Sequence, residues 1–111
     1  MRFDRPLQVS QNEPTAPASS DFDFSFTVPR DQEWRIKSIQ IETAGNSTIT
    51  QVTLAGQNFA IASSELSSGV LDLEAKFGNE IRVTRNEVIG VRTNNPDAGT
   101  EDVTVTITGT K

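Results

Sequence analysis

The chain has 111 residues, of which 34% are hydrophobic and 23% charged, and its net charge is −5. This length predicts one domain with one core, and the negative charge disfavours nucleic acid as a partner, because phosphates bind basic surfaces. Cysteine, histidine and tyrosine are absent. Their absence excludes disulfides, thiolate metal ligands, cysteine nucleophiles and Ser-His-Asp catalysis.

The first twenty residues differ in composition from the rest of the chain. Three prolines lie among Gln, Asn, Ser and Thr, which predicts an extended N-terminal arm (1–20) ahead of a domain at 21–111. The hydrophobic side chains of Phe3, Leu7 and Val9 favour an arm that docks on a neighbouring subunit; a frayed terminus is the alternative. The arm has no apolar core of a signal peptide, so we expect synthesis in a cytoplasm without secretion.

Residues 21–43 predict two strands joined by a turn. Phe22, Phe24 and Phe26 alternate with polar residues, which is the period of a half-buried strand. Pro29 and the polar residues after it end that strand, because proline cannot donate to a ladder. A second strand at residues 33–43 follows, with Trp34 and Ile36 on one face, and a shift of one residue after Ile36 predicts a bulge or bend.

The remaining residues predict further short strands and no packed helix. A second phase shift follows Ile49, and residues 63–65 could form a single helical turn. About eight strands separated by Gly, Asn and Pro turns indicate an all-β fold, an antiparallel β-sandwich or jelly roll. Whether the sheets close into a barrel stays open. The later predicted strands are residues 48–55, 59–61, 71–77, 81–83, 88–91 and 102–108.

Carboxylates occur in two pairs, each on one face of a predicted strand. Asp21 with Asp23, and Asp72 with Glu74, could act as a glycosidase pair or bind Ca²⁺. We interpret both as solvated strand faces, because the outward face must be polar in any case. The oxygen-rich loop 94–102 could hold a cation, but turn chemistry is the favoured interpretation. We therefore predict no catalytic, cofactor or metal residues, and no enzyme.

Arg30, in the predicted loop at residues 29–33, and Trp34, directly after it, are the candidates for a surface contact. An indole at a strand end could stack on a sugar, which makes a carbohydrate- or receptor-binding module the alternative function. No second Trp and no Tyr is present to extend such a platform. Packing of Trp34 at the margin of the core is therefore favoured.

The segment FTVPRDQEWRIKSIQIE, the short strands with Gly turns and the terminal VTVTITGT strand together resemble a family of virion proteins. These are small β-sandwich or jelly-roll proteins such as the head decoration (cement) proteins of tailed bacteriophages. The resemblance implies a structural protein on the virion surface that binds the major capsid protein, is commonly a homotrimer, and clamps capsomers through a terminal arm. That arm would be residues 1–20, anchored by Phe3, Leu7 and Val9.

Overall fold

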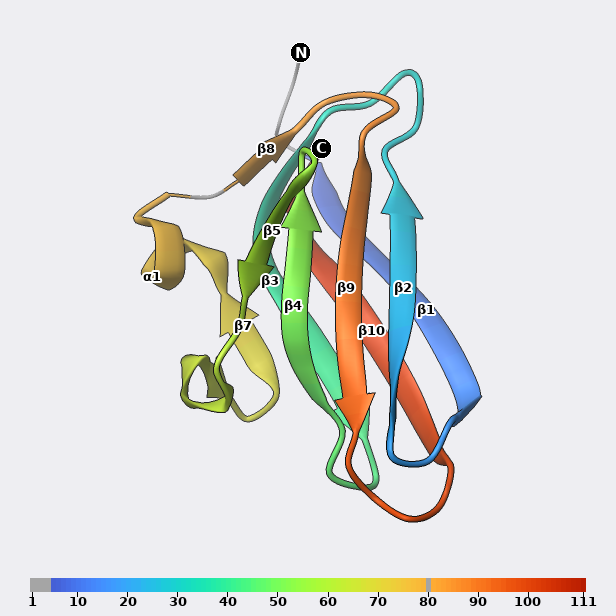
Figure 1. The fold of residues 1–111 in the computed structure, drawn as a ribbon. Coiled ribbons are helices and arrows are strands. Elements are labelled where there is room, and N and C mark those ends of the chain that lie inside the picture. The colour runs from blue at the N-terminus through green and yellow to red at the C-terminus, as the bar shows by residue number, and fades with distance from the viewer. Residues whose placement is uncertain (1–4, 80) are drawn as a thin grey trace.

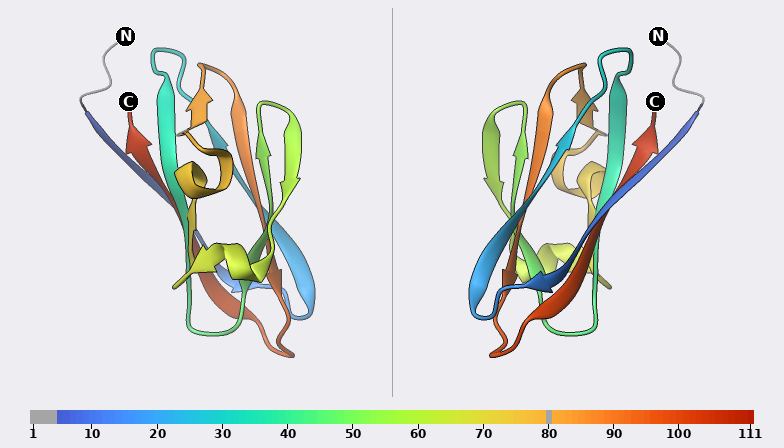
Figure 2. Two further views of the ribbon diagram at one scale, coloured as in Figure 1. Left: turned by 90° about the vertical axis from the view of Figure 1, so that its left-hand side faces the viewer. Right: turned by 90° about the vertical axis from the view of Figure 1, so that its right-hand side faces the viewer.

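The computed structural model describes residues 5–79 and 81–111. Most of these residues lie in antiparallel strands that form two sheets packed face to face (Figures 1 and 2). The elements are β1 (Pro6–Ala16), β2 (Ser20–Thr27), β3 (Trp34–Thr43), β4 (Thr48–Leu54), β5 (Gln57–Ala60), a 3₁₀ turn (Ser63–Glu65), β6 (Leu66–Ser67), β7 (Val70–Asp72), α1 (Leu73–Phe77), β8 (Ile81–Val83), β9 (Val88–Asn95) and β10 (Glu101–Thr110).

The strand order is that of a jelly roll. The six-stranded sheet has the order β1-β10-β3-β7-β6, with β8 also paired to β3, and the four-stranded sheet has the order β2-β9-β4-β5. The pairs β1 with β10, β2 with β9, β3 with β7 and β8, and β4 with β5 are successive rungs of one long antiparallel hairpin. Rolling that hairpin places alternate rungs in opposite sheets. The prediction of an all-β sandwich is confirmed.

The core lies between the two sheets, where the inward side chains of both meet. Phe24 and Phe26 of β2 are 3% exposed, and Val28 after them is fully buried. From the six-stranded sheet, Ile107 and Ile39 are fully buried too. Buried and more exposed side chains therefore alternate along β2 and β10, as the sequence pattern of both segments predicted.

Both predicted phase shifts coincide with irregularities in the strand pairing. The register of β3 against β10 shifts between Ile36 and Ser38, and that of β4 against β9 shifts between Ile49 and Gln51. At the first shift, a Cβ on Gly109 would lie 1.9 Å from the Arg35 carbonyl oxygen. Glycine is thus the residue that lets these two backbones approach.

The prediction of a separate arm at residues 1–20 was wrong where the structure describes them. Residues 6–13 pair continuously with β10, from Pro6 opposite Thr110 to Glu13 opposite Val103. Leu7 is 2% exposed and belongs to the core, and Val9 is partly buried and packs against the core. Phe3 lies outside the described residues. An edge strand needs few apolar side chains, so its composition is similar to that of a linker.

The predicted strand at 71–77 was wrong in its second half. β7 ends at Asp72, and residues 73–77 form the short helix α1. The Asp72 carboxylate accepts hydrogen bonds from the backbone N–H groups of Glu74 and Ala75 (3.0 and 3.2 Å). Gly78 ends the helix in the left-handed conformation, with φ of 82°. These two caps stabilise a helical turn that alternation alone does not predict. The single helical turn predicted at 63–65 is present as the 3₁₀ turn.

Leu7→Ala tests whether β1 belongs to the folded core. Because the side chain is buried, we expect the substitution to lower the free energy of unfolding by about 2–4 kcal/mol, measured by urea denaturation. Gln8→Ala on the exposed neighbour is the matched control and should change it by less than about 0.5 kcal/mol. An equally small effect of Leu7→Ala would contradict the integration of β1.

Candidate functional site

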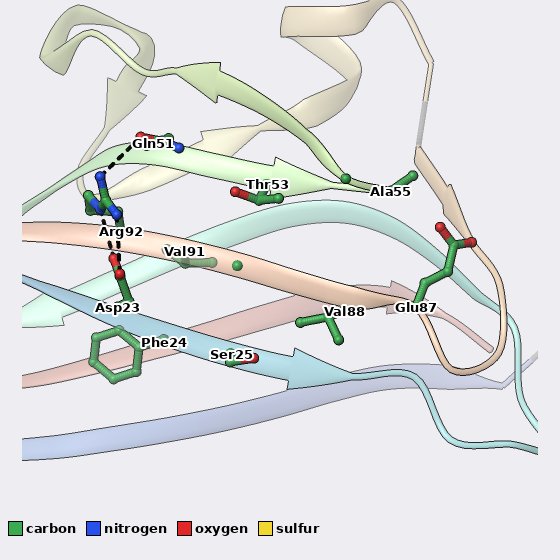
Figure 3. Close-up of a pocket in the computed structure, with 12 residues that line it drawn as sticks. Asp23, Phe24, Ser25, Gln51, Thr53, Ala55, Glu87, Val88, Val91 and Arg92 are labelled. Atoms are coloured by element: carbon green, nitrogen blue, oxygen red, sulfur yellow. Dashed lines mark hydrogen bonds and ion pairs between the residues drawn. The ribbon is translucent and has the colours of Figure 1, made fainter.

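A groove of about 550 Å³ crosses the outer face of the four-stranded sheet, on the side away from the core (Figure 3). It is lined by β2, β9 and β4 and by the turn at residues 55–56. Grooves of this volume can accept a small ligand or a protruding part of a partner. Its lining includes the outward residues Asp23, Ser25, Gln51, Thr53, Val88 and Arg92.

The groove exists because the middle of its central strand has no side chain. Gly90 of β9 lies between Ser25 of β2 and Thr53 of β4 in the strand register. A Cβ on Gly90 would lie 3.3 Å from the Thr53 Cβ, which is a tight contact. One missing side chain between two small hydroxyl residues therefore makes the hollow.

One end of the groove is charged and held by an ion pair. The register places Asp23, Arg92 and Gln51 side by side on three adjacent strands. The Arg92 Nε and Nη2 donate to the two Asp23 carboxylate oxygens (2.8 and 3.3 Å), and Nη1 donates to Gln51 Oε1 at 3.4 Å (Figure 3). This bidentate geometry fixes the guanidinium across the three strands.

The ion pair shifts the pKa values of both its members. The hydrogen bond from Arg92 lowers the pKa of Asp23, and the hydrogen bond to Asp23 raises the pKa of Arg92. The Asp23 side chain is 62% exposed and the Arg92 side chain 43% exposed. Water therefore screens the pair, and its contribution to stability is small. Its main effect is to orient the Arg92 side chain at the groove.

The other end of the groove is apolar. Val88 is 46% exposed, and among the described residues it is the large hydrophobic side chain that lies open to solvent. The turn of Ala55 and Gly56 lies beside it, and Glu87 completes this end. The Glu87 carboxylate accepts hydrogen bonds from the backbone N–H and the hydroxyl of Thr84, which lower the pKa of Glu87. Val88 and Arg92 are four residues apart on β9, so the two ends lie about 13 Å apart.

The residues proposed from the sequence do not form one surface. Trp34 is 4% exposed, and its Nε1 donates to Gln32 Oε1 at 2.8 Å. A buried ring offers no face to a sugar, so Trp34 as a surface contact was wrong, whereas its packing against the core is confirmed. Arg30 is exposed in the turn between β2 and β3, and Leu7 is in the core.

Three of the four carboxylates in the predicted pairs accept hydrogen bonds within the chain. Asp21 accepts a hydrogen bond from Asn94 Nδ2 at 2.9 Å, and Asp23 binds Arg92 as described. Asp72 caps α1, and Glu74 lies on that helix and not on the strand predicted to carry both. Asp21, Asp23 and Asp72 therefore serve contacts between strands and the capping of α1 in this fold.

The loop at residues 94–102 is organised by its own side chains. Asn95 is 3% exposed, its amide nitrogen donates to the Gly99 carbonyl at 2.9 Å, and its oxygen accepts from the Asp97 N–H at 2.9 Å. The Asp97 carboxylate accepts from the backbone and side chain of Asn46, which lower the pKa of Asp97. This is the turn chemistry favoured from the sequence. Among the described residues, no three carboxylates gather as metal ligands do.

The groove itself was missed from the sequence, although one signal was present. Val88, Gly90 and Arg92 occupy alternate positions of one strand and therefore share a face. An apolar residue and a glycine on the solvent face of a strand are unusual there, because that face needs neither packing nor a small residue. The hydrophobic run of residues 88–91 concealed this alternation.

Comparison of the chain with protein-family models, with curated proteins and with solved structures finds no match in any of the three. The helices in the described part of the chain are too short and too polar to cross a bilayer. The groove and the fold are therefore the observations from which a function can be inferred.

The pKa of Asp23 tests the geometry of the charged end. In an NMR titration of the side-chain carboxyl carbons, we expect Asp23 to titrate below the usual Asp range in the wild type and to return to it in Arg92→Gln. Because the folded-state pKa is lowered, the small stabilisation is present above the unfolded-state pKa and is lost as pH falls through the folded-state value. Asp97 is the internal control, since Asn46 and not Arg92 lowers its pKa. An Asp23 pKa unchanged by Arg92→Gln would contradict the ion pair.

Proposed function

We propose that the protein is a non-enzymatic virion accessory protein, a capsid decoration protein that docks on the major capsid protein through the groove face of its four-stranded sheet. The observation that carries the binding role is the groove around Gly90, which has an oriented guanidinium at one end and exposed Val88 at the other. Localisation to the capsid surface follows from this proposal.

The chemistry of the groove suits a protein partner. Protein interfaces combine a small apolar centre with a polar rim, and arginine is enriched in them. Val88 and the backbone at Gly90 can contact an apolar side chain of a partner. Arg92 retains exposure while paired, so a partner carbonyl or carboxylate near Asp23 and Gln51 can approach it. The site is open and preformed, which suits docking with little rearrangement.

The virion assignment is supported by analogy and by the sequence resemblance. Jelly rolls are common in viral capsid and lectin domains, and the order of the strands here is that of a jelly roll. A fold hosts many functions, so the fold supports the class of protein and the groove supports the act of binding. The resemblance of the Trp34 strand and the terminal strand to decoration proteins points to the same class.

Glycan binding is a second candidate, and it now concerns the groove instead of Trp34. The planar polar groups of Asp23, Gln51 and Arg92 lie side by side, and such groups hydrogen-bond neighbouring sugar hydroxyls. A glycan array probed with the wild-type chain separates the two functions. Specific sugar binding lost in Arg92→Ala favours a receptor-binding module, and no sugar binding removes this candidate.

Val88→Asp tests docking through the groove. The substitution places a charge at the exposed apolar end, so we expect binding to capsid shells assembled from the major capsid protein of the same genome to weaken at least about tenfold. Cosedimentation with purified shells measures this. The side chain is already half exposed, so the unfolding midpoint should change little.

Ser67→Asp is the matched control, because it adds the same charge at an exposed strand position on β6 in the other sheet. It should bind shells as the wild type does. Failure of the wild-type chain to bind the shells would overturn the decoration role, and equal loss in both variants would overturn the groove as the docking site.

A further inference from the structure

The outer edge of β1 carries an inference independent of the proposed function. β1 is the first strand of the six-stranded sheet and, within residues 5–79 and 81–111, pairs with β10 alone. In the right-hand view of Figure 2, β1 is the foremost strand, and none of the described helices or strands lies over it. A long uncovered edge is a template for pairing with another strand.

A hydrogen bond at the start of β1 shows which of its backbone groups point to that edge. The Lys111 N–H donates to the Arg5 carbonyl at 3.0 Å. Residues of an antiparallel strand face its neighbour alternately, so the odd-numbered residues after Arg5 face β10. The even-numbered residues Gln8, Ser10 and Asn12 therefore direct their N–H and C=O groups outward.

The other side of the sheet gives the same alternation independently. The Ile41 N–H donates to the Gly69 carbonyl at 2.8 Å, on the side of β3 away from β10. Gln40 therefore faces Thr106 of β10, which leaves Ile107 to face Val9 of β1. Both routes assign Val9 to the ladder and its neighbour Ser10 to the free edge.

Two prolines bound the free segment. Pro6 and Pro14 have no N–H to offer, and prolines are found on edge strands for that reason. Between them, Gln8, Ser10 and Asn12 are exposed and present an uninterrupted row of donors and acceptors. The segment is symmetric about Ser10, with one proline four residues away on each side.

We propose that two copies of this chain pair antiparallel through their β1 edges, with the two-fold axis at Ser10. In this register Gln8 lies opposite Asn12 of the second copy, and each Ser10 lies opposite the other. Three outward residues on each strand then form about six hydrogen bonds between the N–H and C=O groups of the two copies. Pro6 lies opposite Pro14 of the second copy, so the two positions without an N–H face each other. Every outward N–H of Gln8, Ser10 and Asn12 then has a carbonyl acceptor in the second copy.

Charge favours this pairing at β1 and opposes it at the edge of β2. Glu13 is the single charged residue of β1, and in the proposed register the two copies of Glu13 lie about 20 Å apart, beyond the screening length. The outward residues of β2 include Asp21 and Asp23. The Ser25 carbonyl is already bonded by Gln11 Nε2 at 2.6 Å.

An isologous edge produces a closed dimer with one continuous sheet across the axis. This differs from the homotrimer implied by the resemblance to decoration proteins. The two assemblies have different masses, so a solution measurement separates them. The interface is narrow and polar, so we expect it to form at high protein concentration.

Light scattering coupled to size-exclusion chromatography tests the proposal at loading concentrations up to about 1 mM. The wild-type mass should rise toward twice the 12.1 kDa of the chain. Ser10→Pro removes the outward N–H at the axis from both copies and should weaken the dimer at least about tenfold. Ser10→Ala loses the hydroxyl contact with Thr106 (2.8 Å) but keeps the N–H, so it should dimerise as the wild type does.

Circular dichroism and the unfolding midpoint establish that Ser10→Pro is folded, and if it is not, Ser10→Lys replaces it, because two like charges meet at the axis. In this cysteine-free chain, Ser10→Cys should form a disulfide-linked dimer under mild oxidation. A monomer at every concentration, a trimer, or a dimer that neither Ser10→Pro nor Ser10→Lys weakens would overturn the proposal.

Discussion

The pairing of the first strand with the last is the interaction on which the rest of the structure depends. β1 runs along β10 from Pro6 opposite Thr110 to Glu13 opposite Val103, and this pairing is the outermost rung of the rolled hairpin. It brings Leu7 into the core and covers one edge of β10. It also leaves β1 itself as the edge. The alternation imposed by β10 then decides which backbone groups of β1 remain available to another chain.

The fold could be predicted from the sequence where burial on one face leaves a period of two. Phe22 to Phe26 and Val103 to Ile107 show this period plainly, and the phase shifts after Ile36 and Ile49 correspond to real shifts in register. β1 was missed because just Leu7, Val9 and Ala16 of its residues contact the core. α1 was missed because capping, and not hydrophobic periodicity, determines its one turn.

The candidate site could not be predicted in the same way, because it depends on contacts between distant segments. The hollow at Gly90 needs Ser25 and Thr53 on either side, and no local pattern gives that register. Trp34 shows the converse case. Its position after a polar turn was compatible with exposure or burial, and the pairing of Trp34 with Val83 of β8 decides for burial. Residue type indicated candidates, and strand register determined which of them reach solvent.

Amide hydrogen exchange along β1 tests the central pairing most directly. In dilute solution, the N–H groups of Val9, Gln11 and Glu13 should be protected by β10, and those of Gln8, Ser10 and Asn12 should exchange rapidly. Raising the protein concentration should slow exchange at Gln8, Ser10 and Asn12, whose N–H groups bond to the second copy in the proposed dimer. Rapid exchange throughout residues 6–16, or protection without this alternation, would contradict the account.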